Sequence, residues 1–198
     1  MRHRCFSTEC NKPLDGLDYR ASRPFASWRS SHLETLIGGW LQLDPPCLEL
    51  ATLALAELSN RGEDLNARMK FARVDLEPIS WLDRARSHVL INLAPDAGAA
   101  VGRGQVYVIL RGGYTAENGW YGAYVGSTVK SVDRRYNEHR VGKRSARGLP
   151  EHGIEPLYSL FLPINPVSAR KEKLREWETR LNDCLSQVVP KVTGDVAF

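Results

Sequence analysis

With 198 residues, the chain is long enough to bury a sizeable core as one large domain or two small ones. Its apolar content of 42% and its charged content of 25% are typical of a globular protein. The sequence contains no run of about 18 apolar residues, which a membrane span would need, and no apolar run of a signal peptide follows its N-terminus. We therefore expect a cytoplasmic protein without a membrane partner.

The net charge of +4 is unevenly distributed. Residues 1–100 carry 12 basic against 13 acidic residues, whereas residues 101–198 carry 15 against 10. Seven of the basic residues lie in one segment that holds two acidic residues, and they are Lys130, Arg134, Arg135, Arg140, Lys143, Arg144 and Arg147. Such local basicity suits a polyanion such as nucleic acid, although a solvated basic loop would have the same composition.

The four cysteines are scattered along the chain and show no pattern of a disulfide framework, so we expect reduced thiols at Cys5, Cys10, Cys47 and Cys184. His3, Cys5 and Cys10 could form half of a zinc site, but no second pair of ligands follows at the required spacing.

The pattern of apolar residues predicts that residues 1–101 form a mostly helical region, with helices over about 31–43, 47–60, 64–73 and 81–89. Ser31 and Glu34 have the spacing of a capping box, and Gly62 is a stop signal for the second helix. Three short helices in succession are compatible with a helix-turn-helix DNA reader whose recognition element would be 66–73. An ordinary helical layer that supports the fold or a dimer is the favoured interpretation.

Residues 102–198 predict an α/β unit. The β-branched and aromatic run at 105–111 indicates a strand, and the Asn118-Gly119 pair indicates a hairpin that returns at 120–125. A third strand is predicted at 157–164. Helices are predicted at about 132–140 and 168–188.

The first of these helices has a basic pair on its apolar face. On a helical wheel, Arg135 and His139 lie with Val132 and Tyr136, whereas Arg134 lies nearly opposite. An inward-facing basic pair costs free energy unless it is satisfied. A structural arginine with a carboxylate partner and a core histidine would explain the pattern, and so would a functional site.

The second helix carries an acidic residue in its apolar stripe. Glu178 lies between Leu174 and Leu181 at helical spacing. A carboxylate there must be paired, hydrogen-bonded or bound to a metal. A salt bridge to Arg135 and a Mg²⁺ ligand are both open, because hard divalent cations prefer carboxylate oxygens.

The segments Val106-Tyr107-Val108 and Tyr124-Val125-Gly126, followed in order by Arg135, His139 and Glu178, resemble the GIY-YIG nuclease superfamily from Gly104 to Gly194. The resemblance implies an α+β fold with a small three-stranded antiparallel sheet flanked by helices. It also implies a divalent metal, Mg²⁺ or Mn²⁺, and hydrolysis of nucleic-acid phosphodiesters. It assigns the catalytic positions and the metal ligand to Tyr107, Tyr124, Arg135, His139 and Glu178, with Glu178 on the metal.

The chain departs from the family pattern at two supporting positions. Thr193 stands where the family commonly has an asparagine. Ser127 stands where some members have a lysine, and Lys130 is the nearest substitute.

These residue types suit phosphodiester hydrolysis. A tyrosine can take a proton from water if its pKa falls well below its usual value of about 10, and a histidine can accept the phenolic proton. An arginine holds phosphate oxygens through its planar fork, and Mg²⁺ on a carboxylate stabilises the leaving 3′ oxygen. Which of Tyr107 and Tyr124 is the base stays open at this point.

We therefore expect a Mg²⁺-dependent endonuclease for double-stranded DNA, of the restriction type and dimeric, whose helical part (1–101) supplies recognition and dimer contacts to a nuclease domain (102–198). The nucleic-acid contacts would come from Lys130, Lys143, Arg144 and Arg147. A structure-specific repair or recombination nuclease is one alternative, and a non-catalytic nucleic-acid-binding module with the same fold is another.

Overall fold

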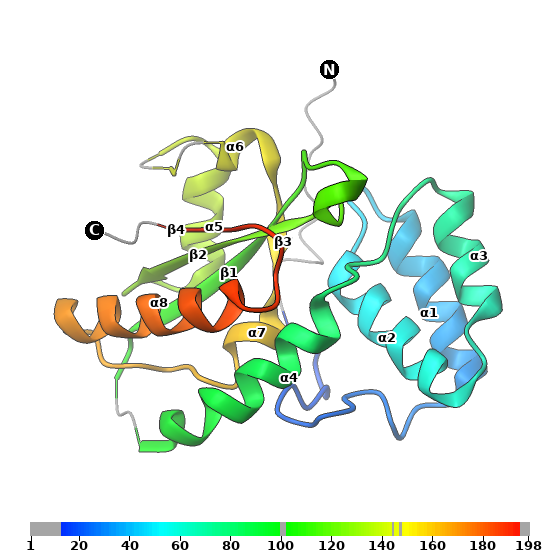
Figure 1. Ribbon diagram of the computed structural model, residues 1–198, viewed down its shortest axis with the longest axis horizontal. Coiled ribbons are helices and arrows are strands. Elements are labelled where there is room, and N and C mark those ends of the chain that lie inside the picture. The colour runs from blue at the N-terminus through cyan, green and yellow to red at the C-terminus, as the bar shows by residue number, and fades with distance from the viewer. Residues whose placement is uncertain (1–12, 100–101, 144, 147, 195–198) are drawn as a thin grey trace.

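The computed structural model describes residues 13–99, 102–143, 145–146 and 148–194, and it has an α+β fold with one four-stranded sheet (Figure 1). The sheet order is β3-β1-β2-β4. The central strand β1 pairs antiparallel with β2 and with β3, and β4 pairs parallel with β2. The α+β class agrees with the prediction, but the sheet is four-stranded and mixed, not three-stranded and antiparallel. Its strands are β1 (Gln105–Arg111), β2 (Gly122–Thr128), β3 (Gly153–Pro156) and β4 (Val192–Gly194).

The strand β1 has the predicted bounds, because β-branched and aromatic side chains occupy both of its faces and all become buried between residues 106 and 110. The strand β2 begins two residues later than predicted. Trp120 adopts a left-handed conformation with φ 64° and is 46% exposed, so it belongs to the turn. Gly119, with φ 68°, ends the short 3-10 helix η3 (Ala116–Asn118) at the predicted Asn-Gly pair.

Within the described residues, four α-helices precede the sheet, and each lies where a helix was predicted: α1 (Ser30–Gln42), α2 (Leu48–Arg61), α3 (Leu65–Arg73) and α4 (Leu82–Asn92). Helices α1, α2 and α3 form a layer on one side of the molecule (Figure 1). Gly62 ends α2 with φ 73°, as predicted. The capping box was wrong, because Arg29 is the N-cap of α1 without a side-chain cap bond and Ser31 lies inside the first turn.

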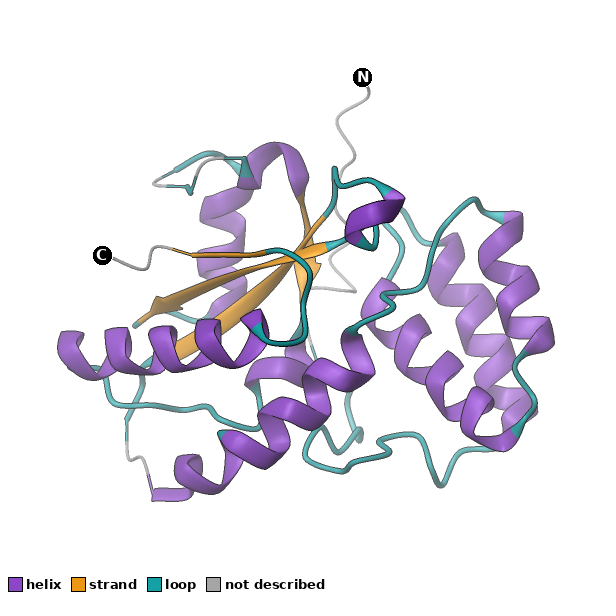
Figure 2. Cartoon of the chain, in the orientation of Figure 1, coloured by secondary structure: helices purple, strands orange, loops and turns teal. Residues whose placement is uncertain are grey.

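Two longer helices cover the sheet, α5 (Val132–Arg140), which has the predicted bounds, and α8 (Lys171–Ser186). They lie on opposite sides of the strands in Figure 2. Three short helical segments complete the described fold, namely η2 (Ala94–Ala99), α6 (Leu149–His152) and α7 (Tyr158–Phe161).

The predicted strand at 157–164 was wrong, because the strand ends at Pro156 and the chain continues as α7. The cause lies far away in the sequence. The backbone N–H groups of Tyr158 and Ser159 donate to the carboxylate of Glu49 at 3.0 and 2.8 Å. These hydrogen bonds satisfy the N–H groups at the start of a helical turn, which have no partner within the helix. In a strand, successive N–H groups would point in opposite directions and could not both reach Glu49.

The helix α2 is capped in a reciprocal manner. Glu155, on β3, accepts a hydrogen bond from the backbone N–H of Glu49 in the first turn of α2, at 2.7 Å. Glu49 and Glu155 are 2% and 3% exposed. The two halves of the chain therefore exchange helix caps through a pair of buried carboxylates.

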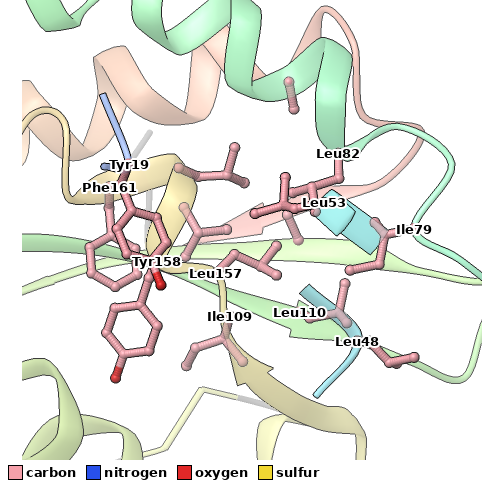
Figure 3. Close-up of a cluster of buried hydrophobic side chains, with 14 of the residues drawn as sticks. Tyr19, Leu48, Leu53, Ile79, Leu82, Ile109, Leu110, Leu157, Tyr158 and Phe161 are labelled. Carbon is pink, nitrogen blue, oxygen red and sulfur yellow. The ribbon is translucent and has the colours of Figure 1, made fainter. Parts of the chain in front are cut away.

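The two halves of the chain also share one hydrophobic core. The indole N–H of Trp81 donates to the carbonyl oxygen of Tyr121 at 3.0 Å, and this bond fixes the start of α4 beside the hairpin. The division of the chain into domains at residues 101 and 102 stays a prediction. Side chains from both halves meet in Figure 3, among them Leu53, Ile79, Leu82, Ile109, Leu110 and Leu157.

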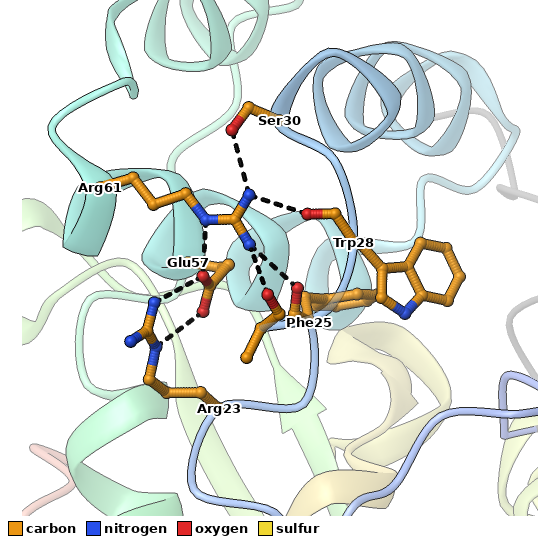
Figure 4. Close-up of polar contacts among 7 residues, drawn as sticks. Arg23, Phe25, Trp28, Ser30, Glu57 and Arg61 are labelled. Atoms are coloured by element: carbon orange, nitrogen blue, oxygen red, sulfur yellow. Dashed lines mark hydrogen bonds and ion pairs between the residues drawn. The ribbon is translucent and has the colours of Figure 1, made fainter.

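A polar network ties the segment before α1 to the end of α2 (Figure 4). The guanidinium of Arg61 donates to Glu57 at 2.7 Å, to the carbonyl oxygen of Trp28 at 2.7 Å and to Ser30 Oγ at 3.0 Å. It also donates to the carbonyl oxygens of residues 25 and 26 at 3.2 and 3.1 Å. Arg23 donates to the same Glu57 carboxylate at 3.0 and 2.7 Å.

The cysteines differ from the prediction at one position. Cys47 is disulfide-bonded, whereas Cys184 is a free, buried thiol. Among the helices that the structure describes, none combines the length and the apolarity that crossing a membrane requires.

Candidate active site

The centre of the candidate site is a contact between β1 and α5. Tyr107 Oη lies 2.8 Å from His139 Nε2. Both side chains are 1% exposed. Thirty-two residues separate them in the sequence, and they meet because Tyr107 is on the face of β1 that the inward side of α5 covers.

A glycine on β2 makes room for this tyrosine. Tyr107 is paired in register with Gly126. A Cβ atom on Gly126 would lie 2.5 Å from Tyr107 Oη and 2.6 Å from Tyr107 Cζ, closer than atoms can approach. The phenol ring therefore lies across the backbone of β2, and only glycine permits this approach.

The second tyrosine, Tyr124, completes an aromatic cluster. Its ring centroid lies 6.2 Å from that of Tyr107 and 5.6 Å from that of His139, and the latter pair is T-shaped. Tyr124 is 3% exposed. It hydrogen-bonds to Tyr107, an interaction that lowers the pKa of Tyr107.

Arg135 approaches the same phenol from α5. Its hydrogen bond and charge lower the pKa of Tyr107, and Tyr107 in turn raises the pKa of Arg135 against the opposing effect of burial. The Arg135 side chain is 16% exposed and that of Arg134 is 72% exposed. This difference agrees with the helical wheel, which placed Arg135 inward and Arg134 in solvent.

The net effect on Tyr107 is opposite to what a phenolate base needs. Burial is the largest cause, and it raises the pKa of Tyr107 to about 12 in spite of Arg135 and Tyr124. The negative charge of Glu178 raises that pKa further. Tyr107 is therefore protonated at neutral pH, and its proton can leave only if an acceptor such as His139 takes it.

Glu178 lies near this cluster on α8, and its carboxylate accepts a hydrogen bond from Ser127 Oγ at 2.6 Å. Glu178 is 8% exposed. Its negative charge raises the pKa of Tyr107. In the described part of the chain, no group of three or more His, Cys, Asp or Glu side chains could hold a metal ion. A single carboxylate still fits Mg²⁺, which keeps several water ligands and often takes one or two protein carboxylates.

Lys130 is linked to Arg135 through the carboxylate of Glu138. Lys130 Nζ lies 2.5 Å from Glu138 Oε1, and Arg135 donates to the other oxygen of Glu138 at 3.4 Å. Lys130 and Arg135 thus share one carboxylate, and these cations lower the pKa of Glu138. Of the other predicted nucleic-acid contacts, Lys143 is exposed just after α5, and Arg144 and Arg147 lie outside the described residues.

Thr193 is the register partner of Tyr124 on the neighbouring strand β4, but its hydroxyl is bonded to other groups. Its hydroxyl accepts a hydrogen bond from Arg111 at 3.1 Å and donates to the carbonyl oxygen of Ala123 at 3.3 Å. Arg111 is the last residue of β1, four residues from Tyr107. Thr193 therefore serves the opposite end of the strand from the Tyr107–His139 contact.

Three residues of the site were missed by sequence reasoning. Ser127 holds Glu178, Glu138 joins Lys130 to Arg135, and Ser145 contacts the second ring nitrogen of His139. Ser127 directly follows the second tyrosine motif, so its position was a usable signal. Glu138 and Ser145 gave no comparable signal in the sequence, because single polar residues in a basic segment have no periodicity.

No family model, curated protein or solved structure matches the chain. What the site can do must therefore be argued from its own geometry. A second tyrosine, an arginine and a histidine gather around the phenol of Tyr107, and the charge of the Glu178 carboxylate also acts on it. Such a set can bind an anionic group, move a proton away from it and hold a hard cation.

Proposed function

We propose that the protein is a Mg²⁺-dependent endonuclease of the GIY-YIG type that hydrolyses phosphodiester bonds of double-stranded DNA. One observation carries the proposal: the hydroxyl of Tyr107 is bonded to His139 while Arg135 binds the same phenol. A buried tyrosine, histidine and arginine in this arrangement are suited to a proton transfer next to an anion. The order of the same residues in the sequence supports the same reaction class.

In the proposed reaction, the oxygen of a water molecule forms a bond to phosphorus, and the bond from phosphorus to the 3′ oxygen breaks. Tyr107 accepts a proton from the water while it gives its own proton to His139 Nε2. The leaving 3′ oxygen takes a proton from solvent. Arg135 binds the non-bridging oxygens, where negative charge develops in the transition state.

A divalent cation, Mg²⁺ or Mn²⁺, would be held by Glu178 and would supply charge neutralisation at the phosphate and the leaving oxygen. Ser127 fixes the orientation of the Glu178 carboxylate through its hydrogen bond of 2.6 Å. Each carboxylate oxygen has more than one lone pair, so a carboxylate that accepts a hydrogen bond can also bind a cation.

The helical layer of α1, α2 and α3 is proposed to supply recognition and dimer contacts. Leu65 and Met69 lie four residues apart on α3 and are 71% and 46% exposed, so an apolar strip faces outward there. Large exposed apolar side chains on a neighbouring pair of turns favour an interaction surface. A restriction-type enzyme uses such a layer for a symmetric dimer on a symmetric DNA site. A structure-specific repair nuclease and a non-catalytic binding module stay as the alternatives.

Incubation of the purified protein with supercoiled plasmid, with and without Mg²⁺, tests the proposal. We expect Mg²⁺-dependent cleavage that Arg135→Ala abolishes and Arg134→Ala largely retains, measured as a single-turnover rate at saturating enzyme. Discrete bands would support the restriction type, and cleavage confined to branched or nicked DNA would support the repair type. Equal loss in both arginine variants would contradict the role of Arg135, and DNA binding without any cleavage would favour the binding module.

A further inference from the structure

His139 has a second partner in the loop that follows α5. Its Nδ1 lies 3.3 Å from Ser145 Oγ, six residues further along the chain. The loop turns back at Gly142, which has φ 74° and whose backbone N–H donates to the carbonyl oxygen of His139 at 3.1 Å. After this left-handed turn the half-buried Ser145 lies within hydrogen-bonding distance of the imidazole ring.

The hydrogen bonds of Ser145 determine which nitrogen of His139 carries the proton. A serine hydroxyl has one proton to donate, and Ser145 Oγ donates it to the carbonyl oxygen of Ala146 at 3.2 Å. The contact at 3.3 Å with Nδ1 must then be a hydrogen bond that Ser145 accepts, so Nδ1 carries the proton. In neutral imidazole the other nitrogen, Nε2, is left with its lone pair, and that lone pair faces Tyr107 Oη at 2.8 Å.

We propose that Ser145 is a positioning residue that holds His139 in the Nδ1–H tautomer and thereby makes Nε2 the acceptor for the Tyr107 proton. The proton transfer is balanced: the O–H bond of Tyr107 breaks, an N–H bond forms at Nε2, and the imidazolium keeps its Nδ1–H bond to Ser145. In the opposite tautomer, Nε2–H would donate to Tyr107 Oη and leave the phenolic proton no acceptor on His139.

This assignment also distinguishes the two tyrosines. Tyr107 is the tyrosine whose hydroxyl lies 2.8 Å from His139 Nε2. The consequence for cleavage rests on the proposed nuclease function, whereas the tautomer itself does not. The two can therefore be measured separately.

The tautomer is measured in full-length protein labelled with ¹⁵N in histidine, by long-range ¹H–¹⁵N correlation at a pH where His139 is neutral. The His139 signals are assigned from their absence in His139→Asn. We expect a protonated Nδ1 and an unprotonated Nε2 in the wild type and in Ser145→Thr, which keeps the hydroxyl. In Ser145→Ala we expect a shift toward Nε2–H, with a single-turnover cleavage rate lower by about tenfold and unchanged DNA affinity. The exposed residue Ser186 provides the control variant, and Ser186→Ala should match the wild type in both measurements.

A wild-type His139 with its proton on Nε2 would overturn the proposal, and so would an unchanged tautomer in Ser145→Ala. If Ser145→Ala shifts the tautomer as expected and no form of the protein cleaves DNA, the positioning role stands and the proposed nuclease function fails. If the tautomer behaves as expected and Ser145→Thr restores the rate lost in Ser145→Ala, both are supported.

Discussion

The phenol of Tyr107 lies directly across Gly126, its register partner on the neighbouring strand, so that a Cβ atom on Gly126 would come within 2.5 Å of the phenolic oxygen. This relationship explains why the second motif ends in glycine. The ring reaches His139 only because β2 offers bare backbone at this position. The packing of two strands thus sets the geometry of the proposed proton transfer.

The first prediction concerns this close approach. Gly126→Ala should displace the phenol of Tyr107 from His139, and a displacement of about 1 Å can lower a catalytic rate by about 10²-fold. The unfolding free energy should fall by about 1–3 kcal/mol, as for other cases of overpacking. Single-turnover cleavage and chemical denaturation measure the two effects.

A matched glycine provides the control. Gly39 lies within α1, and a Cβ atom there would meet no other atom within 4 Å. Gly39→Ala should therefore raise stability by up to about 1 kcal/mol through helix propensity, with cleavage unchanged. Cleavage by Gly126→Ala within about threefold of the wild-type rate would mean that the Tyr107–His139 contact is not needed for the chemistry.

The second prediction is that Glu178 binds the metal. Gln in its place can still accept the hydrogen bond from Ser127, so Glu178→Gln should keep or slightly raise the melting temperature in the absence of metal. Cleavage should be lost, because a neutral amide is a poor ligand for a hard cation. DNA binding in EDTA should persist, since Arg135 is unaffected.

If Glu178 were half of a structural ion pair, its removal would cost about 3–5 kcal/mol. A large drop in metal-free melting temperature together with substantial remaining cleavage would therefore exclude the metal role.

The third prediction is an unusual pH dependence of stability. Burial raises the pKa of Glu49 to about 7, and burial together with the charge of Glu49 raises the pKa of Glu155 well above its ordinary value. The ionisable groups that interact with this pair include Arg86, Tyr19, Tyr136 and Tyr158, and the charge of Arg86 opposes the shift of the pKa of Glu49. The folded state then binds more protons than the unfolded state above pH ~4.5. Stability therefore falls as pH rises through the folded pKa values.

We expect the unfolding free energy at pH 8 to be lower than at pH 5.5 by on the order of 2 kcal/mol. Glu155→Gln should flatten this dependence and raise stability at pH 8, because an amide oxygen can accept the N–H of Glu49 without a charge. The exposed Glu151→Gln on α6 should leave the dependence as in the wild type. Urea denaturation across pH measures it, and a stability that rises between pH 5.5 and pH 8 would contradict the prediction.

The fourth prediction concerns the clamp around Arg61 (Figure 4). Arg61→Ala removes one donor from the carbonyl oxygens of three residues and one of the two arginine partners of Glu57, so we expect a loss of about 2–4 kcal/mol. Arg61→Lys should recover only part of this loss, because an ammonium group lacks the planar fork.

Arg68 is the matched control for this clamp. It makes a solvent-exposed i,i+4 pair with Asp64 at 2.6 Å, and its side chain is 58% exposed. Arg68→Ala should therefore cost no more than about 0.5 kcal/mol. Similar losses in Arg61→Ala and Arg68→Ala, measured by urea denaturation, would show that the clamp contributes little.

The sequence by itself determined the elements whose pattern is local. The bounds of β1 and α5 follow from β-branched residues and from helical spacing, and the inward direction of Arg135 follows from the helical wheel. The motif could be recognised from the sequence because each of its residues lies in such a locally determined element, namely the two tyrosines, Arg135, His139 and Glu178.

Only the tertiary structure decided the features that depend on partners far along the chain. The segment after Pro156 is helical because Glu49, more than a hundred residues earlier, accepts the N–H groups of its first turn. The parallel strand β4 exists because β2 offers an edge to Val192–Gly194, which are too few residues to show a strand pattern alone. The proton on His139 is placed by a serine in an irregular loop. Propensity acts over a few neighbouring residues, whereas these hydrogen bonds exist only after the chain has folded and brought the partners together.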